Sequence, residues 1–321
     1  MTNRRRFQTT TIGLAALAVL SLASCRSLPG INGNGQASQG PGTETHTLTS
    51  GGMSRTYIEH IPANHPDHPA LVVILHGADS TAAGVESNTN FDHWSDKDGF
   101  IAVYPQGFDN GWADGRGVDP SDRAHIDDVG FLAKVVGEVE GRDHADPKRV
   151  FFTGISNGGF MAERFACDRA DLVSAIAPVA SSIGTSVNAG CHPSMPVSVM
   201  DIHGTADPLV PFSGGAMSGR GGISHIISAD QVFADWSRRD GCHGSPHSHS
   251  GPHRTNDGTS VEITVATGCP SGVAVQEWKI IGGGHSWPGL PQNLPVRFIG
   301  VVSQQFSAPA KIWDFLTHHG R

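Results

Sequence analysis

The sequence predicts an α/β fold in which a mostly parallel central sheet carries helices on both faces. Short, nearly uninterrupted apolar runs recur along its 321 residues, and such runs are typical of parallel strands that are buried on both sides. Stretches with the spacing of amphipathic helices separate these runs, and this alternation indicates a layered α/β domain. The 41 glycines and a charged fraction of only 16% favour a loop-rich globular protein over a coiled coil or a helical solenoid.

The strands begin with an antiparallel pair and continue as buried runs. Residues 55–61 alternate between apolar and polar side chains, and a turn at residues 50–52 would pair them with residues 46–49. The buried strands are expected at residues 70–75, 100–104, 150–153, 174–178, 197–202 and 275–281. Ligands bind beyond the carboxyl ends of such parallel strands, so candidate functional residues are sought there.

Helical patterns fill the segments between the strands. They lie near residues 90–98, 129–141, 157–167 and 229–239. Asp127 and Asp128 precede the second of these helices, and capping accounts for at least one of the two. The last helix covers about residues 308–317, with Ser307 as its cap and Pro309 in its first turn.

Residues 1–24 have the pattern of a secretory signal peptide. Three arginines at residues 4–6 precede an uncharged apolar run that is shorter than the ~20 residues a membrane-spanning helix needs. Residues 22–25, Leu-Ala-Ser-Cys, resemble a bacterial lipobox, in which the cysteine (here Cys25) is lipidated and becomes the mature N-terminus. Residues 4–7, Arg-Arg-Arg-Phe, resemble a twin-arginine export signal. A plain cleaved signal with an incidental cysteine is the alternative.

A flexible tether and one larger domain are expected after the signal. Residues 25–44 are mainly Gly, Ser, Asn, Gln and Pro, which bury too little apolar surface to become ordered. We expect this lipid-anchored segment to hold a monomeric domain, residues 45–321, off a membrane surface. The net charge of −8 excludes a basic nucleic-acid footprint, so no nucleic-acid partner is expected.

The four remaining cysteines predict two disulfides, because an exported chain meets an oxidising compartment. Three pairings are possible, and proximity in the sequence favours Cys167–Cys191 and Cys242–Cys269. The sequence contains no CxxC pair, which argues against a zinc site, and no metal or cofactor is expected. The histidine-rich run 242–253 could suit a metal, but we interpret it as a polar loop between a helix and a hairpin.

The strongest functional signal is a G-x-S-x-G motif between a predicted strand and a predicted helix. The motif is Gly154-Ile155-Ser156-Asn157-Gly158. Its glycines allow a sharp turn that exposes the hydroxyl of Ser156 as a candidate nucleophile, and an ordinary glycine-rich turn is the alternative. A serine hydroxyl needs a base to remove its proton, so a histidine and an acid are expected further along the chain.

The hydrolase order places the acid next and the histidine last. Asp207 lies in a turn just beyond the strand 197–202, and His285 lies in a glycine-rich loop after the strand 275–281. We predict that His285 is the base and that Asp207 orients it. An Asx-turn is the alternative role of Asp207, and Asp201 is the reserve acid.

A tetrahedral intermediate would need two backbone donors for its oxyanion. The N–H of Asn157, directly after the nucleophile, is the first candidate. The second is the N–H of Ala78 in the loop after the strand 70–75, with Gly77 in reserve, and His76 is interpreted as structural.

Two tryptophans in predicted loops, Trp112 and Trp287, are candidate substrate-binding walls that could stack on a feruloyl ring or a sugar. Packing within the loops is the alternative for both.

Six segments together resemble the esterase family that contains extracellular polyhydroxybutyrate depolymerases, feruloyl esterases and acetyl xylan esterases. Within this family, the chain is similar to the actinobacterial-type LpqC lipoproteins. The resemblance implies an α/β-hydrolase fold and a metal-independent serine esterase with Ser156, Asp207 and His285 as its triad. The segments are 75–77 (Leu-His-Gly), 104–107 (Tyr-Pro-Gln-Gly), 127–131 (Asp-Asp-Val-Gly-Phe), 154–159 (Gly-Ile-Ser-Asn-Gly-Gly), 203–207 (His-Gly-Thr-Ala-Asp) and 282–288 (Gly-Gly-Gly-His-Ser-Trp-Pro).

The motifs and the resemblance predict an exported, membrane-tethered serine ester hydrolase that works through an acyl-enzyme. Its expected substrates are feruloyl or acetyl esters of carbohydrates, or short 3-hydroxyacyl oligoesters. A non-catalytic surface binding lipoprotein and a cell-envelope acyltransferase are the alternative functions. The complete order of serine, acid and histidine argues against the first alternative, whereas the second would use the same three residues.

Overall fold

The computed structural model describes residues 40–291 and 294–321. The expected signal peptide, the lipidation site Cys25 and most of the tether lie outside these residues and stay predictions. Within the described residues, no helix is long and apolar enough to cross a membrane.

One large sheet forms the centre of the described domain, with the strand order β1-β2-β4-β3-β5-β6-β7-β12-β11-β10. The six strands from β4 to β12 in this order are parallel, and the pairs at both edges are antiparallel. The strands are β1 (Gly42–Ser50), β2 (Met53–Ile61), β3 (Leu71–Leu75), β4 (Ile101–Pro105), β5 (Val150–Ile155), β6 (Ala175–Val179), β7 (Ser198–Gly204), β10 (Gly244–Ser250), β11 (Ser260–Thr267) and β12 (Val275–Ile281).

Helices cover both faces of this sheet, because successive residues of the buried strands point to opposite sides. In β3, Leu71 and Val73 belong to the apolar core beneath α4, α5 and α7, whereas Val72 and Ile74 belong to the core beneath α1, α2 and α9. These helices are α1 (Ala82–Thr89), α2 (Phe91–Asp98), α4 (Asp128–Asp143), α5 (Asn157–Asp168), α7 (Ala229–Arg239) and α9 (Ala308–His318).

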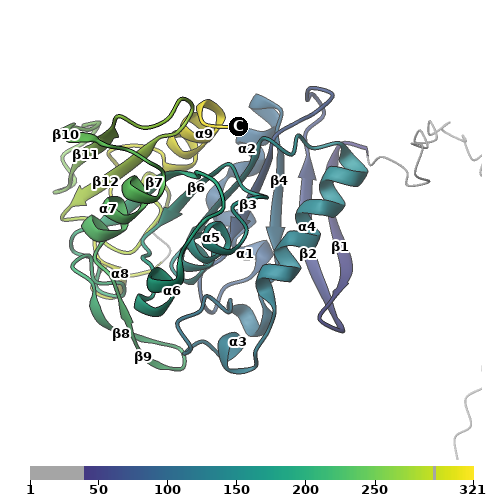
Figure 1. Ribbon diagram of the computed structural model, residues 1–321, viewed down its shortest axis with the longest axis horizontal. Coiled ribbons are helices and arrows are strands. Elements are labelled where there is room, and N and C mark those ends of the chain that lie inside the picture. The colour runs from purple at the N-terminus through teal and green to yellow at the C-terminus, as the bar shows by residue number, and fades with distance from the viewer. Residues whose placement is uncertain (1–39, 292–293) are drawn as a thin grey trace, which may run out of the picture.

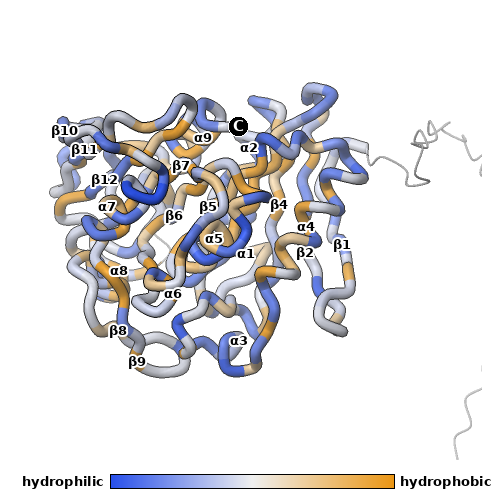
Figure 2. The backbone as a smooth tube through the Cα atoms, in the orientation of Figure 1, coloured by the Kyte–Doolittle hydropathy of each residue, from blue (hydrophilic) through white to orange (hydrophobic). Residues whose placement is uncertain are grey.

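The figures show the same layered arrangement. Helices α4, α5 and α7 lie on the near side of the sheet in Figure 1, and hydrophobic residues concentrate in the central strands in Figure 2. The predicted α/β fold with a mostly parallel sheet and helices on both faces is therefore confirmed.

Two segments differ from the expectation. Strand β1 begins at Gly42, so residues 42–44 pair with β2 and do not belong to a flexible tether. The histidine-rich run is not a loop for most of its length, because residues 244–250 form the edge strand β10 against β11. Every residue of β10 is exposed, so it lacks the apolar alternation by which a strand is usually predicted.

Several short elements carry no clear sequence signal and surround the carboxyl edge of the sheet. A separate hairpin of β8 (Gly215–Gly219) and β9 (Gly222–Ile226) lies between β7 and α7 in the chain. The short helices are η1 (Phe108–Asn110), α3 (Pro120–Arg123), α6 (Thr185–Gly190) and α8 (Val296–Ile299).

Candidate active site

The three predicted triad residues follow three parallel strands of the sheet. Ser156 follows β5, Asp207 lies three residues after β7, and His285 lies four residues after β12. Strands β7 and β12 are direct neighbours, and β6 separates β7 from β5. The structure thus brings the three residues to one edge, at the carboxyl ends of the strands.

Ser156 occupies a strained turn between β5 and α5. Its backbone has φ 55° and ψ −125°, a conformation that non-glycine residues rarely adopt. A methyl group on Gly158 would lie 2.5 Å from the carbonyl oxygen of His76, and one on Gly154 would lie 2.7 Å from the backbone of Gly158. The motif glycines therefore let the turn pack against the end of β3. Helix α5 begins at Asn157, directly after Ser156.

Asp207 is held as a buried carboxylate. Its Oδ1 accepts hydrogen bonds from the backbone N–H groups of Leu209 and Val210 at 2.8 and 2.9 Å. Its Oδ2 lies 2.8 Å from Nδ1 of His285 and 3.5 Å from Nε2 of His203. Burial acts to raise the pKa of Asp207, but the hydrogen bonds with the two histidines outweigh it and hold the pKa below its usual range. The side chain is therefore ionised and oriented toward the His285 imidazole.

The loop that carries His285 is fixed by close backbone packing. The backbone N–H of His285 donates to the carbonyl oxygen of Ile299 at 2.5 Å. A methyl group on Gly284 would lie 2.5 Å from the Cα of Gly300, so a larger residue would push this loop away. The glycines that precede the histidine thus permit a tight loop rather than a flexible one.

The predicted oxyanion loop, residues 76–78, lies against Ser156. A methyl group on Gly77 would lie 3.5 Å from the Cβ of Ser156, and Ala78 lines the same pocket as the serine. His76 anchors the loop from below, because its Nδ1–H donates to the Gly77 carbonyl at 2.8 Å and its Nε2 accepts from the Gly107 N–H at 3.0 Å. Burial lowers the pKa of His76 to about 4, so the ring is neutral, and it is structural as expected.

Two hollows meet at Ser156. The larger has a volume of about 400 Å³ and is lined by both Ser156 and His285. Most of its other lining residues are apolar: Val85, Ile155, Leu209, Trp287, Leu290, Leu294, Ile299 and Val302. The smaller hollow has a volume of about 130 Å³ and shares Ala78 and Leu209 with the larger one. Its lining is mixed, with the apolar residues Val118, Val210 and Met217 beside the polar residues Arg116, Asp119, Asn157 and Arg220.

The two tryptophans have different positions. Trp287 lines the larger hollow and packs edge-on against Phe91, with the ring centroids 6.2 Å apart. The expectation that Trp112 forms a substrate wall is wrong, because its side chain is 0% exposed and its Nε1–H donates to the carbonyl oxygen of His76 at 2.9 Å. Trp112 packs beneath the oxyanion loop instead.

The reserve acid does not fit the role of a triad member. Asp201 lies inside β7 and is 1% exposed. Burial, together with the neighbouring acids Glu163 and Glu277, raises its pKa well above the usual range. Neither of its carboxyl oxygens has a hydrogen-bond partner among the described residues, so Asp201 does not orient the His285 imidazole as Asp207 does.

Sequence reasoning missed a polar layer behind Ser156. The side chain of Asn157 accepts from the Trp112 N–H at 2.8 Å and donates to Asp114 Oδ2 at 2.7 Å. Asp114 in turn pairs with Arg116 at 2.6 Å. Trp112, Asp114 and Arg116 lie in an irregular, glycine-rich loop, and nothing in the periodicity of that loop distinguishes them.

Asp127 caps α4 by accepting from the N–H of Gly130 at 2.8 Å, as the sequence suggested for one of the two aspartates. Asp128 is buried and pairs with Arg55 at 2.7 Å.

The two disulfides have the expected partners, Cys167–Cys191 and Cys242–Cys269. The first ties the end of α5, the helix that follows Ser156, to the residue after α6. Within the described ranges, no group of three or more metal-ligating side chains could hold a metal ion.

Comparison with known proteins relates the chain to esterases, although no protein-family model matches it. The protein named "Putative esterase NocK" from Nocardia uniformis subsp. tsuyamanensis is 29% identical over 286 residues, which cover 85% of this chain and 82% of that relative. Feruloyl esterase B from Piromyces equi is 28% identical over 219 residues, which cover 67% of this chain. The chain spans only 39% of the length of this second relative.

Among solved structures, an acetyl xylan esterase from Aspergillus awamori superposes with a TM-score of 0.55. The match covers 75% of this chain and 94% of that one, at 16% sequence identity. This likeness shows the fold alone. The chain has the α/β-hydrolase fold, and its curated relatives place it among the carboxylic ester hydrolases.

Proposed function

We propose that this protein is an exported, membrane-tethered serine esterase that hydrolyses carboxylic esters through an acyl-enzyme, as a monomer. One observation carries the proposal. Ser156, in its strained turn, and His285, whose Nδ1 lies 2.8 Å from the buried carboxylate of Asp207, line the same pocket. This combination supplies a nucleophile, a base and a group that orients the base.

In the proposed first half-reaction, Nε2 of His285 takes the proton of the Ser156 hydroxyl while Oγ attacks the ester carbonyl carbon. Asp207 keeps the proton of His285 on Nδ1, so that Nε2 can accept one. The N–H groups of Ala78 and Asn157 would stabilise the oxyanion, and one such donor typically contributes ~3 kcal/mol to lowering the barrier. The imidazolium then gives its proton to the oxygen of the leaving alcohol, and the acyl group remains on Ser156.

In the second half-reaction, His285 takes a proton from water, whose oxygen attacks the acyl carbon. The tetrahedral intermediate collapses, Ser156 regains its proton from His285, and the free acid leaves. No metal or cofactor takes part in these steps.

The two hollows suggest how an ester would lie across Ser156. The larger hollow, with its row of apolar side chains, suits an acyl group. The smaller hollow suits a small alcohol group, because Arg116, Asn157 and Arg220 offer hydrogen-bond donors among its apolar lining residues. Names of relatives that include feruloyl and acetyl xylan esterases support carbohydrate-linked feruloyl or acetyl esters as substrates. Short 3-hydroxyacyl oligoesters, toward which the polyhydroxybutyrate depolymerase and LpqC resemblance points, are the second substrate class.

A comparison of the purified full chain with its Ser156→Ala variant tests this function. The substrates are p-nitrophenyl acetate, butyrate and octanoate, followed by methyl ferulate, acetylated xylan and a 3-hydroxybutyrate dimer. We expect hydrolysis by the wild type and a loss of about 10³-fold or more in the variant. Equal rates in both proteins would contradict the assignment of Ser156 as the nucleophile of the triad.

Two further outcomes separate the alternatives. A folded wild type without activity would favour a binding lipoprotein. Transfer of the acyl group to an added sugar, in preference to release of the free acid, would favour an acyltransferase.

The tether is tested separately from the chemistry. The Cys25→Ser variant is expected to lose its membrane association, while the wild type remains in the membrane fraction. Equal membrane fractions for the two proteins would overturn the lipid anchor and leave the esterase proposal unchanged.

A further inference from the structure

The hairpin β8–β9 does not belong to the central sheet, but its residues 217–220 line the smaller hollow at Ser156. Its apolar residues Met217 and Ile226 pack with Phe160 of α5, in a small cluster that also contains Val210. The turn of the hairpin is Arg220–Gly221. The hairpin is therefore anchored on the helix that follows Ser156, and its turn projects toward the loops around the predicted oxyanion hole.

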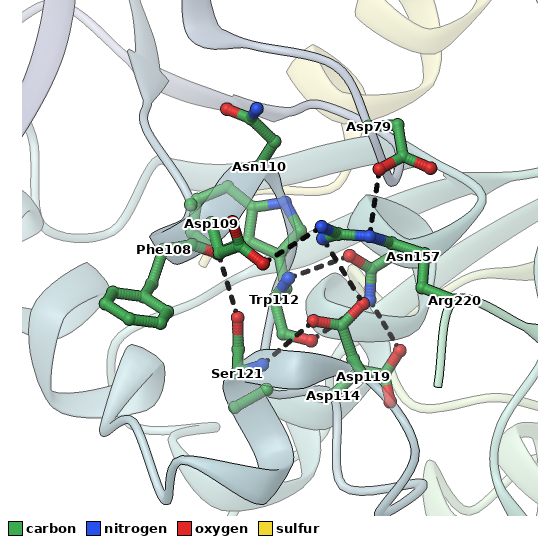
Figure 3. A network of polar contacts seen from close by, with 12 residues as sticks. Asp79, Phe108, Asp109, Asn110, Trp112, Asp114, Asp119, Ser121, Asn157 and Arg220 are labelled. Carbon is green, nitrogen blue, oxygen red and sulfur yellow. Dashed lines mark hydrogen bonds and ion pairs between the residues drawn. The ribbon is translucent and has the colours of Figure 1, made fainter. Parts of the chain in front are cut away.

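Arg220 joins two segments that are far from it in the sequence, the loop after β3 and the irregular segment between β4 and α4. Its Nε lies 2.9 Å from Oδ1 of Asp79, its Nη2 donates to Oδ2 of Asp109 at 3.1 Å, and its Nη1 lies 3.8 Å from Oδ2 of Asp119 (Figure 3). The arginine side chain is only 17% exposed, although Asp79 and Asp109 are mostly exposed. One guanidinium thus holds three carboxylates on the same side of the site.

The contact with Asp79 reaches the predicted oxyanion hole directly. Asp79 follows Ala78, and its backbone has a φ of 60°, in the left-handed region that costs energy for a residue with a Cβ. Its N–H donates to the carbonyl oxygen of Asn110 at 2.9 Å, and Asn110 also has a positive φ. Two strained loops therefore support each other, and Arg220 holds a side chain of each.

Figure 3 shows the same arrangement in the side chains. Arg220 extends between Asp79 and Asp109, while Asn157 and Trp112 lie beside them in the polar layer behind the nucleophile. An exposed ion pair contributes little to global stability. The Arg220–Asp79 ion pair matters for the position of the loop, because an oxyanion donor works only when it is aimed at the place where charge develops.

We propose that Arg220 is a positioning residue that fixes Asp79 and so directs the backbone N–H of Ala78 toward the oxyanion. This inference rests on the proposed function, since it assigns a role within the same reaction. Loss of a whole oxyanion donor lowers kcat by about 10²–10³-fold. Because the loop would be loosened rather than removed, we expect a loss of roughly 10-fold when its support is weakened.

The test compares Arg220→Lys, Asp79→Asn and their double variant in the full chain. Lysine keeps the charge but lacks the fork that contacts several carboxylates at once. We expect kcat for p-nitrophenyl acetate and butyrate to fall by roughly 10-fold in each single variant, with KM changed by less than about twofold. The double variant should be no slower than the single ones, because both changes break the same contact.

Arg123→Gln is the matched control. Arg123 donates to the carbonyl oxygen of Gly221 in the same turn but does not contact the oxyanion loop. We expect wild-type kcat for this variant. Equal losses in Arg123→Gln and Arg220→Lys would show that the hairpin as a whole, and not the Arg220–Asp79 contact, is responsible, and this would overturn the inference.

A transition-state analogue supplies a readout that a merely structural role would not change. A trifluoromethyl ketone forms a tetrahedral adduct with a serine nucleophile, and its affinity should fall by the same factor as kcat/KM. Unchanged kcat and unchanged ketone affinity in both single variants would overturn the proposal. A rise in KM alone would do so too, because it would place Arg220 on the substrate.

The failure of the inference is distinguishable from failure of the function. An inactive wild type, or an active Ser156→Ala variant, overturns the proposed function. An active wild type with unaffected Arg220→Lys and Asp79→Asn variants overturns only the role of Arg220. Because the Asp79 side chain is 73% exposed, we expect Asp79→Asn to fold. This variant therefore tests the contact even if Arg220→Lys does not fold.

Discussion

The turn at Ser156, the proposed nucleophile, depends on glycine at position 158, and the cost of one methyl group there can be worked from the structure. In Gly158→Ala, the new Cβ would lie 2.5 Å from the carbonyl oxygen of His76 and 2.7 Å from the carbonyl carbon of Leu75. Ordinary contacts between carbon atoms are about 3.5–4.0 Å, so the two backbones must separate by roughly 1 Å. The atoms that must move include the strand end that leads directly into the oxyanion loop.

A displacement of about 1 Å at catalytic groups can cost about 10²-fold in rate, and we expect this loss in kcat. Overpacking of this kind also costs about 1–3 kcal/mol of stability. The matched control is Gly137→Ala in α4, where a new Cβ meets nothing within 4 Å. Because alanine favours helix by about 0.5–1 kcal/mol over glycine, this variant should unfold at a slightly higher temperature with full activity.

The assay is steady-state hydrolysis of p-nitrophenyl acetate, with thermal unfolding of the same samples. A Gly158→Ala variant with wild-type kcat and wild-type Tm would refute the reasoning, because it would mean that the turn does not pack closely against β3.

Three further predictions follow from the buried groups. Asp207→Asn should lower kcat by roughly 10³–10⁴-fold, because an amide that donates to Nδ1 of His285 favours the wrong tautomer; a loss below 10-fold in ester hydrolysis would exclude Asp207 from the triad. Burial raises the pKa of Glu163 from 4.5 to about 8. Between about pH 4.5 and 8 the folded protein therefore keeps a proton on Glu163 that the unfolded chain has released. The free energy of unfolding falls as pH rises through this window. In Glu163→Gln, the loss of unfolding free energy between pH 5 and pH 8, measured by urea unfolding, should be smaller by roughly 4 kcal/mol. The exposed-site control Asp168→Asn should behave like the wild type. An unchanged loss in Glu163→Gln would contradict the raised pKa of Glu163. Cys167→Ser/Cys191→Ser should lose about 3 kcal/mol, because the bridge closes a loop with a sequence separation of 24; an unchanged Tm would show that this bridge does not stabilise the domain.

The buried strands could be predicted because both of their faces are covered. Residues 71–75 contribute alternately to two cores, so nearly every position must be apolar and the run is visible in the sequence. The edge strand β10 has no such constraint, since all seven of its residues are exposed. Its pairing with β11 comes from backbone hydrogen bonds, which the composition of a histidine-rich run does not reveal.

The triad candidates could be predicted because each stands in a local pattern with its own physical reason. Glycines flank Ser156 and His285 where backbones approach closely, and Asp207 follows a buried strand. The supporting layer could not be predicted in this way. Asp114 lies in an irregular loop and Arg220 in the turn of a hairpin that the sequence did not predict, and their partners Asn157 and Asp79 are more than 40 residues away in the sequence.

Trp112 shows the limit of reasoning from residue type. An aromatic residue in a predicted loop near the site could have faced the substrate, but the fold turns this side chain inward beneath His76. The direction of the Trp112 side chain is set by the path of the loop between β4 and α4, and that path depends on long-range contacts.

The central claim is that Ser156 carries the acyl group during the reaction. The most direct measurement is rapid mixing of the full chain with p-nitrophenyl acetate, with acid quenching and mass spectrometry of the peptides. We predict a burst of about one p-nitrophenol per chain and one acetyl group on the peptide at Ser156, with neither in Ser156→Ala. Steady hydrolysis without a covalent adduct, or an acetyl group on another residue that persists in Ser156→Ala, would contradict the account.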